Sequence, residues 1–521
     1  MPTPAPASVP TPRPALVAAA FAALKLAIQL LAIRPYGYFR DELYYLACAD
    51  HLDWGYVDHP PLSIAVLKLW RALFGDSLLA LRLPSALAGA AVVYLAGRLA
   101  MAAGGGLTAT VLACVSCLAA PGFLAFHHYY SLNAFDHLFW ILAAYLVARI
   151  VLSPRPVLWI ALGFTLGLGL LNKWSLLWFG AGLALGLVFT PARRSLRTPW
   201  PYVCAAIAAL LFAPHLAWQS AHGFPTLEFM HNALAEKYVR LALGAFLGEC
   251  ALLSNPATVP ISIAGLFAPF FVERLKPFRA LSIIVLTTLA IVASSGSGKP
   301  EYLLAATPIA VALGAAFWEG PLTQRLGARV RFAALAALLS PMLALFAIAL
   351  PFGLPVLSER AFIDYAKRLG ITPQTSEKKE LAELPQFYAD MHGWAELVDA
   401  AELAFASLRE DEKRCAKVWA RTGGYGPAAA VDFFGRARGL PRAISSHNSY
   451  WMWGYGADDA CPVVVLGGDR ARIEETFERI TQVTTVECGY CMPYENHKPV
   501  YVARGMRRSW AELWPLLRHY E

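Results

Sequence analysis

Long apolar stretches recur along the first two thirds of the chain, separated by short polar segments. Most of them approach the roughly 20 residues that a helix needs to cross the hydrocarbon core of a bilayer. We predict eleven spanning helices, near residues 15–33, 83–101, 107–126, 134–152, 157–171, 175–190, 201–218, 257–272, 280–294, 302–318 and 332–352. Because eleven is an odd number, the two ends of the chain would lie on opposite sides of the membrane.

Composition supports a polytopic membrane protein. Of the 521 residues, 57% are hydrophobic and only 15% are charged, which is too apolar for a soluble protein of several domains. The formal net charge of +8 would favour nucleic acid as a partner of a soluble chain, but most basic clusters lie between apolar stretches. The retention of Lys and Arg on the cytoplasmic side explains these clusters better. We therefore expect membrane lipids around the chain and no nucleic-acid partner.

The basic clusters also predict the orientation, because short loops rich in Lys and Arg stay in the cytoplasm. The Pro-rich segment 1–14 is then a disordered cytoplasmic tail. Loops 34–82 and 219–255, and everything beyond about residue 353, face the outside. We expect a multi-pass protein of the cell inner membrane with a periplasmic C-terminal region. The basic loops contain Arg98, Arg149, Arg155, Arg193, Arg194, Arg197, Arg274, Lys276, Arg279, Arg325, Arg329 and Arg331.

The outer segments have predicted elements of their own. Apolar residues at helical spacing over 61–74 predict a helix lying in the membrane interface. Residues 358–521 are polar and mixed, which predicts a soluble α/β domain after an all-α membrane bundle over 15–352. In that domain we predict helices near 394–409, 427–437, 469–479 and 508–519, and strands near 415–420, 462–467, 481–487 and 498–503.

Four cysteines of the outer region form an even set, Cys415, Cys461, Cys488 and Cys491. Disulfides persist outside the cytoplasm, so we favour disulfide pairing, with the pairs left open. Cys488-Gly-Tyr-Cys491 with His497 could instead bind zinc, but one such motif and a single His make an incomplete ligand set.

The acids Asp41 and Glu42 follow the first apolar stretch and are surrounded by aromatic residues, including Tyr44 and Tyr45. A carboxylate at the membrane surface is partly desolvated and still reachable, so it suits a general base acting on a lipid-linked substrate. The alternative is that the two acids mark a solvated start of a loop.

Asp136 is a second candidate, at the outer end of the fourth predicted span and next to His127, His128 and His137. Because this level of the membrane is also that of Asp41, we expect the two acids to share a cleft. The alternative is an acid that stabilises a helix start through its dipole. The histidines are candidate metal ligands, although interfacial packing is the simpler state for each.

Isolated cations at outer span ends could bind a phosphate. Lys173 and Lys299 are the most informative, because the positive-inside rule disfavours a cation there. Their alternative role is to reach lipid headgroups. Other candidates at this level are His59, Lys237, Arg240 and Arg40.

Several of these motifs resemble those of a known family. The Asp41-Glu42 pair, Tyr56-Val-Asp-His-Pro-Pro-Leu62, Asn133-Ala-Phe-Asp136 and Lys299-Pro-Glu-Tyr-Leu-Leu304 occur in an order similar to that of bacterial polyprenyl-phosphate-sugar glycosyltransferases of the C-type membrane fold. That group includes protein O-mannosyltransferases and lipid A aminoarabinose transferases. His59 replaces a Lys of the latter. The resemblance covers residues 15–352, and Tyr425-Gly-Pro and Ser446-His-Asn-Ser-Tyr-Trp451 resemble tails of further members.

The resemblance implies an inverting transfer from a polyprenyl monophosphate sugar to a lipid, glycan or protein acceptor outside the cytoplasm, with no cofactor required and a divalent metal possible. Asp41 would be the base, with Glu42 and Asp136 orienting the sugar or the acceptor. The donor phosphate would be bound by His59, Lys173, Arg240, Lys299 and Tyr302, and the substrate by Tyr44, Tyr45, Asp58, His128 and Asn133.

Two other functions fit the same features less well. A lipid or solute transporter or flippase also needs many spans, but transporters place polar sites near the midplane of the bilayer, whereas the acids here lie at one face. A receptor or scaffold would need fewer spans than eleven for an anchor.

Overall fold

The computed structural model describes residues 12–33, 36–296, 299–322, 326–375 and 377–521. These divide into two compact units. The first contains residues up to 33, 82–214 and 240–356, and the second contains 36–81, 215–239 and 357–521. Segment 36–81 and the start of the second predicted loop thus pack with the C-terminal region. Residues 1–11 of the predicted cytoplasmic tail lie outside the described residues.

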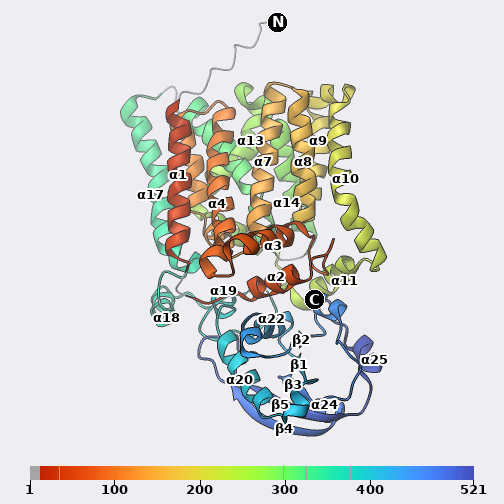
Figure 1. Ribbon diagram of the computed structural model, residues 1–521. Helices are drawn as coiled ribbons and strands as arrows, with labels where there is room; N and C mark the ends of the chain where they lie inside the picture. Colours follow the sequence, from red (N-terminus) through yellow and green to blue (C-terminus); the bar gives the residue numbers. More distant parts are fainter. Residues whose placement is uncertain (1–11, 34–35, 297–298, 323–325, 376) are drawn as a thin grey trace. The chain divides into compact units, whose positions relative to one another are not determined.

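The first unit is built from apolar helices that run alongside one another (Figure 1). Helices α4 and α10 each have a few residues that belong to the second unit. The helices are α1 Pro12–Leu31, α4 Leu78–Ala102, α5 Leu107–Leu118, α6 Pro121–Phe126, α7 Leu132–Leu152, α8 Pro156–Asn172, α9 Leu176–Phe189, α10 Trp200–Ala221, α12 Leu243–Ser254, α13 Val259–Phe271, α14 Arg279–Ser294, α15 Glu301–Leu304, α16 Thr307–Phe317 and α17 Ala328–Gly353.

Each of the eleven apolar ranges contains a helix, but the number of spans is not confirmed. In the described part of the chain, six helices are long and apolar enough to cross a membrane, or up to eight if two bent helix pairs each count as one span. Helices α5 and α8 are apolar but shorter. The range 107–126 is interrupted before Pro121, which begins α6. Length alone therefore overestimated the continuity of some apolar stretches.

Several long helices expose apolar side chains. Only 6% of the apolar window of α17 is buried, and 22% of that of α10. Leu210 and Phe332 are examples, each about three quarters exposed. Apolar surface of this extent is unfavourable in water but is satisfied by lipid chains. The protein is therefore a multi-pass membrane protein.

Inside the first unit, helices pack closely at small residues. A Cβ atom added to Gly265 of α13 would lie 1.8 Å from the carbonyl oxygen of Ala310 in α16, and one added to Gly314 would lie 1.8 Å from that of Ile261. Close approach of backbones at small residues is the usual way in which membrane helices gain packing energy. Lys25 also contributes, because its buried Nζ donates to the carbonyl of Phe123 at 3.0 Å.

The second unit contains a five-stranded sheet with the strand order β2-β1-β3-β5-β4 (Figure 1). Strand β1 (Lys417–Ala420) pairs in parallel with β2 (Ala443–Ile444) and with β3 (Val463–Leu466). Strand β5 (Lys498–Met506) runs antiparallel to β3 and to β4 (Phe477–Val486). The central strands β1 and β3 are buried throughout, as parallel strands usually are.

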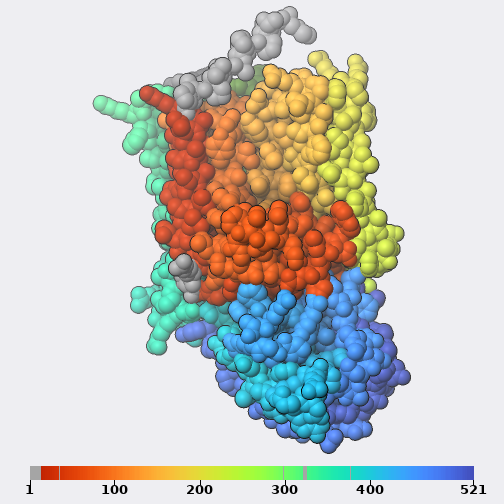
Figure 2. All heavy atoms as spheres, in the orientation of Figure 1, coloured from red at the N-terminus to blue at the C-terminus, as the bar shows by residue number. Residues whose placement is uncertain are grey.

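Short helices accompany this sheet. In Figure 2 the C-terminal strands and helices, drawn in cyan and blue, form one closely packed body. Its core contains Trp419, Phe477, Trp510 and Trp514. The helices of the unit are α2 Arg40–Asp50, α3 Leu62–Phe74, α11 Pro225–Asn232, α18 Glu359–Arg368, α19 Gln386–Ala389, α20 Trp394–Ala406, α21 Glu410–Lys413, α22 Tyr425–Ala430, α23 Ser449–Trp453, α24 Arg470–Glu474 and α25 Trp510–Leu513.

The predicted helix at 469–479 was wrong in its second half. Helix α24 ends at Glu474, and β4 begins at Phe477, because Phe477 pairs with Met506 of β5 and enters the core. The sequence pattern also missed β2, which has only two residues. The interface helix predicted over 61–74 corresponds to α3, on which Leu69, Leu73 and Phe74 are exposed. The cysteines are paired as Cys415–Cys461 and Cys488–Cys491.

The α13–α16 contact generates a stability prediction. Gly314→Ala should lower the free energy of unfolding by about 1–3 kcal/mol, because its methyl group must displace the Ile261 backbone. Gly180→Ala in α9 is the matched control, since no described atom lies within 4 Å of its added Cβ and Ala is the better helix former. Thermal unfolding in detergent measures both, and equal midpoints would contradict the close packing.

Candidate functional site

Helix α2 positions both acids of the first pair. Glu42 is fully buried, and its Oε2 accepts a hydrogen bond at 2.9 Å from the backbone N–H of Phe39, the residue before the helix. A carboxylate that satisfies an N-terminal backbone donor stabilises the helix start and complements the helix dipole. Glu42 therefore has a structural task, and its predicted contact with sugar or acceptor stays a prediction.

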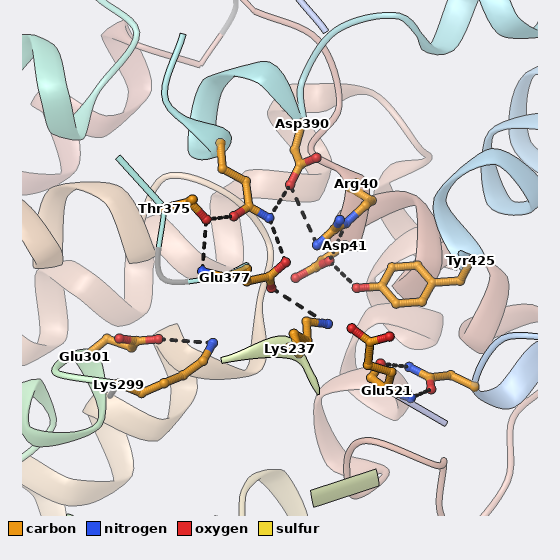
Figure 3. Close-up of polar contacts among 12 residues, drawn as sticks. Arg40, Asp41, Lys237, Lys299, Glu301, Thr375, Glu377, Asp390, Tyr425 and Glu521 are labelled. Carbon is orange, nitrogen blue, oxygen red and sulfur yellow. Dashed lines mark hydrogen bonds and ion pairs between the residues drawn. The ribbon is translucent and has the colours of Figure 1, made fainter. Parts of the chain in front are cut away.

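Asp41 is held differently, and its side chain is 29% exposed. The Tyr425 hydroxyl donates to Asp41 Oδ1 at 2.7 Å, and Arg40 Nε lies 3.7 Å from the same oxygen (Figure 3). Among the described residues, no hydrogen bond reaches Oδ2. The carboxylate is thus oriented through one oxygen while the other stays available.

Beside Asp41, cations and carboxylates alternate in a network (Figure 3). Arg40 Nη2 lies 3.7 Å from Asp390 Oδ2. Gln386 Nε2 donates to Asp390 at 3.3 Å and to Glu377 at 3.1 Å. Glu377 in turn lies 3.7 Å from Lys237 Nζ. Each buried charge in this network has a partner of opposite sign, which offsets the cost of desolvation.

A third cluster surrounds Asp58. The Tyr44 hydroxyl donates to Asp58 Oδ1 at 2.9 Å and lies 2.8 Å from Ser449 Oγ. The Tyr44 ring also stacks on Tyr425, with the centroids 4.2 Å apart. Burial raises the pKa of Asp58, and the nearby His59 opposes that shift. Tyr44 therefore links Asp58 to the tyrosine that orients Asp41.

His59 and Tyr45 belong to the same cluster. Their rings are 5.2 Å apart and both are buried. The Nδ1 atom of His59 lies 2.9 Å from the carbonyl oxygen of Pro60. A buried imidazole that contacts a backbone carbonyl offers little surface to a phosphate. The burial of His59 therefore does not support its predicted phosphate role, which stays a prediction.

The first unit contains a separate polar cluster around Asp136. Ser175 Oγ donates to Asp136 Oδ1 at 2.5 Å, and Lys173 Nζ lies 3.5 Å from Oδ2. Lys173 also donates to Asn133 Oδ1 at 2.7 Å, and its Nζ lies 5.0 Å from the centroid of the Tyr302 ring. The structure therefore brings together four predicted residues from three separate segments of the chain. Asp136 does not cap α7, because the side chain of Ser131 performs that task.

The other predicted residues of the first unit make different side-chain contacts. Lys299 Nζ forms an ion pair with Glu301 at 3.4 Å. Arg240 is exposed. His128 is buried, and its Nε2 lies 3.1 Å from Arg82 Nη1. Within the described residues, no group of three or more His, Cys, Asp or Glu side chains is arranged to hold a metal ion.

Asp41 and Asp136 belong to different units, so the cleft that they were expected to share stays a prediction. Sequence reasoning missed Asp390, Ser175 and the roles of Tyr425 and Ser449. The last two lie in Tyr425-Gly-Pro and Ser446-His-Asn-Ser-Tyr-Trp451, which the resemblance had singled out without a function. Those motifs were the available signal.

Asp390 generates a prediction on pH dependence. Burial raises its pKa from 3.8 to about 7, against the opposing effect of Arg40. The folded protein therefore keeps a proton that the unfolded chain loses, and this contribution to stability declines as the pH rises from about 4 to about 7. Asp390→Asn should flatten the decline in thermal midpoint between pH 5 and 7.5. Asp364→Asn, at an exposed position of the same unit, should keep the wild-type slope, and equal slopes in all three proteins would contradict the assignment.

Lys173 generates a second prediction. Lys173→Met should destabilise the protein by up to about 3–5 kcal/mol, because Asp136 would be left as a buried charge with no cation beside it. The double variant Lys173→Met/Asp136→Asn should recover at least half of this loss. Thermal unfolding in detergent measures the cycle, and additive losses would show that the two side chains do not interact.

Part of the sequence and the overall fold are similar to those of known proteins. A family model described as dolichyl-phosphate-mannose-protein mannosyltransferase matches residues 58–218. No curated protein sequence matches the chain. A crystal structure of ArnT from Cupriavidus metallidurans bound to undecaprenyl phosphate shares the fold, with a TM-score of 0.58 and 15% identity, over 93% of this chain and 97% of that one.

A more distant similarity points to the same fold. The oligosaccharyltransferase from Archaeoglobus fulgidus in its apo form matches with a TM-score of 0.52 and 12% identity, over 83% of this chain and 64% of that one. The mannosyltransferase model matches a segment that begins at Asp58 and includes Asp136 and Lys173. Over residues 58–218 the sequence is therefore similar to this mannosyltransferase family, and over most of its length the chain shares the fold of the ArnT structure.

Proposed function

We propose that the protein is an inverting glycosyltransferase that moves a sugar from a polyprenyl monophosphate to a lipid, glycan or protein acceptor outside the cytoplasm. The observation that carries the proposal is the state of Asp41. Its Oδ1 is held by Tyr425 and faces Arg40, and among the described residues no hydrogen bond reaches Oδ2. A carboxylate fixed in this way is suited to take a proton from an acceptor group.

The proposed step is a single displacement. Asp41 Oδ2 accepts the proton of the acceptor hydroxyl or phosphate while the oxygen of that acceptor group attacks the anomeric carbon. The polyprenyl phosphate leaves from the opposite side with the bonding electrons. One displacement inverts the anomeric configuration. Tyr425 keeps the carboxylate in place during the step, and fixed polar groups of this kind need no reorganisation as charge develops.

The leaving phosphate needs positive charge and oriented donors. We assign this task to Lys173, which Asp136 and Asn133 hold in place and which lies over the Tyr302 ring. Lys299, Arg240 and His59 are further proposed donors to the phosphate. Because these side chains supply the charge, we propose that transfer needs no metal, so that an excess of EDTA should leave the rate within twofold.

The proposed location follows from the charge distribution. From the basic loops between the apolar helices, we propose that the N-terminal tail lies in the cytoplasm and the second unit on the outer side of the cell inner membrane. On that side the second unit would meet the acceptor. The polyprenyl chain of the donor would lie against the apolar helices of the first unit. The similar ArnT structure contains undecaprenyl phosphate, which supports a donor of this class.

Asp41→Asn tests the proposal. The variant should lower transfer from a radiolabelled polyprenyl-phosphate sugar by about 10²–10⁴-fold, the usual contribution of a general base, with little change in thermal midpoint. Asp50→Asn is the matched control in the same helix, because Asp50 is exposed and pairs with Lys68 and Arg71. It should retain transfer within twofold.

Two results would overturn the proposal. Normal turnover by Asp41→Asn would remove Asp41 from the base role. A wild-type protein that binds the lipid-linked sugar and leaves it intact with every acceptor extract would instead favour a transporter.

A further inference from the structure

The second unit contains a cavity of about 570 Å³. It lies at one edge of the sheet, where two parallel strands end. The segment Arg421–Tyr425 follows β1 and the segment Ser445–His447 follows β2, and both line the cavity. In open α/β sheets, ligands bind outside the carboxyl ends of parallel strands. The position is therefore that of a ligand site.

The lining of the cavity is strongly basic. Its lining includes five Lys and Arg residues and two acidic residues, Glu377 and Glu521. Clustered positive charge around a concave site attracts anions and raises their local concentration. The cations are Arg40, Lys237, Lys379, Arg421 and Arg518.

Two of these cations form no close ion pair. Within the described part of the chain, no carboxylate lies within ion-pairing distance of Arg421 or Lys379. Their contacts are with aromatic faces: the Arg421 guanidinium lies 4.8 Å from the Trp419 ring, and Lys379 Nζ lies 5.7 Å from that of Tyr494. The other three cations have carboxylate neighbours: Arg40 has Asp390, Lys237 has Glu377 and Arg518 has Glu228. Arg421 and Lys379 therefore form no close ion pair, and the carboxylates that act on them, Glu475 and Glu521 respectively, do so at longer range.

The floor of the cavity is rigid. Gly423 and Gly424 both have positive φ, and a Cβ on Gly423 would lie 2.2 Å from Glu495 Oε1. Glu495 forms a buried ion pair with Lys498, whose Nζ also donates to the carbonyl of Thr422 at 3.3 Å. The backbone thus lies directly on a buried ion pair. A fixed floor of this kind lowers the entropic cost of ordering a ligand.

The wall of the cavity also reaches the proposed base. Tyr425 and Arg40 line the cavity, and both contact Asp41 Oδ1. On the same wall, His447 has a buried Nδ1 with no hydrogen-bond partner among the described residues, and its ring lies 5.1 Å from that of Tyr425. An unpaired buried polar atom beside unpaired cations is typical of a site that a polar ligand completes.

We infer that this cavity binds an anionic group of the acceptor, of the phosphate class, with Arg421 and Lys379 as its principal contacts. The assignment of this anionic group to the acceptor rests on the proposed function. Arg and Lys together suit a phosphate, the guanidinium through paired N–H donors and the ammonium as a compact charge. The volume exceeds that of a phosphate, so the site has room for a sugar attached to it. The other source of the same chemistry is the phosphate of the donor lipid.

A titration distinguishes these two sources. The full-length protein in detergent is titrated with inorganic pyrophosphate at low ionic strength, and separately with undecaprenyl phosphate, by calorimetry. Arg421→Gln/Lys379→Gln should raise the Kd for pyrophosphate at least tenfold and leave that for undecaprenyl phosphate within twofold. Arg508→Gln/Lys367→Gln is the matched control. It removes the same two residue types from exposed positions outside the cavity lining and should leave both Kd values within twofold.

Several results would overturn the inference. These are a wild-type protein that does not bind pyrophosphate, a double variant that binds it as tightly as the control, or an equal loss of affinity for both probes, which would make the cavity a donor site. Lys379→Gln alone, at an exposed position, serves if the double variant unfolds, and it should raise the Kd for pyrophosphate at least threefold. Because the titration needs no turnover, it can fail while Asp41→Asn still abolishes transfer, and it can succeed while Asp41→Asn transfers normally.

Discussion

The hydrogen bond from Tyr425 to Asp41 is the interaction on which the functional interpretation depends. It joins residues 384 positions apart in the chain and holds a partly exposed carboxylate in one orientation. Helix α2 can supply this carboxylate because its own residues from Glu42 to Ala49 are buried, and because Tyr44 is anchored to Ser449 as well. The proposed base is therefore a product of how one short helix packs within the second unit.

Charge pairing is the second constraint on the structure. In each unit, buried carboxylates lie beside cations, as with Asp390 and Arg40 in the second unit and Asp136 and Lys173 in the first. Such pairs seldom add net stability, because desolvation offsets their attraction. We propose instead that these buried pairs are present because the reaction needs charges that are fixed in position. The same argument separates them from Arg71 and Asp76, whose partly exposed pair only ties α3 to its following loop.

The sheet of the second unit contributes a cavity as well as a packed core. Its parallel strands β1 and β2 end side by side, and the residues after them form a cavity whose wall includes the tyrosine that orients Asp41. A cationic cavity and a carboxylate base that share Tyr425 would place an anionic acceptor next to the group that activates it. Under this proposal, the sheet would select the acceptor and helix α2 would supply the base.

Hydropathy and local propensity determined much of this protein by themselves. They located the apolar helices, four of the five strands, and the acids and cations that stand out at the ends of apolar stretches, because these signals act within about 20 residues of chain. They failed at 469–479, where pairing with β5 overrode a helical pattern. Only the tertiary structure decided that Asn133, Asp136, Lys173 and Tyr302 gather, that Glu42 caps its own helix while Asp41 meets Tyr425, and that basic residues from distant segments line one cavity. These contacts depend on packing between segments far apart in the chain, which no local pattern encodes.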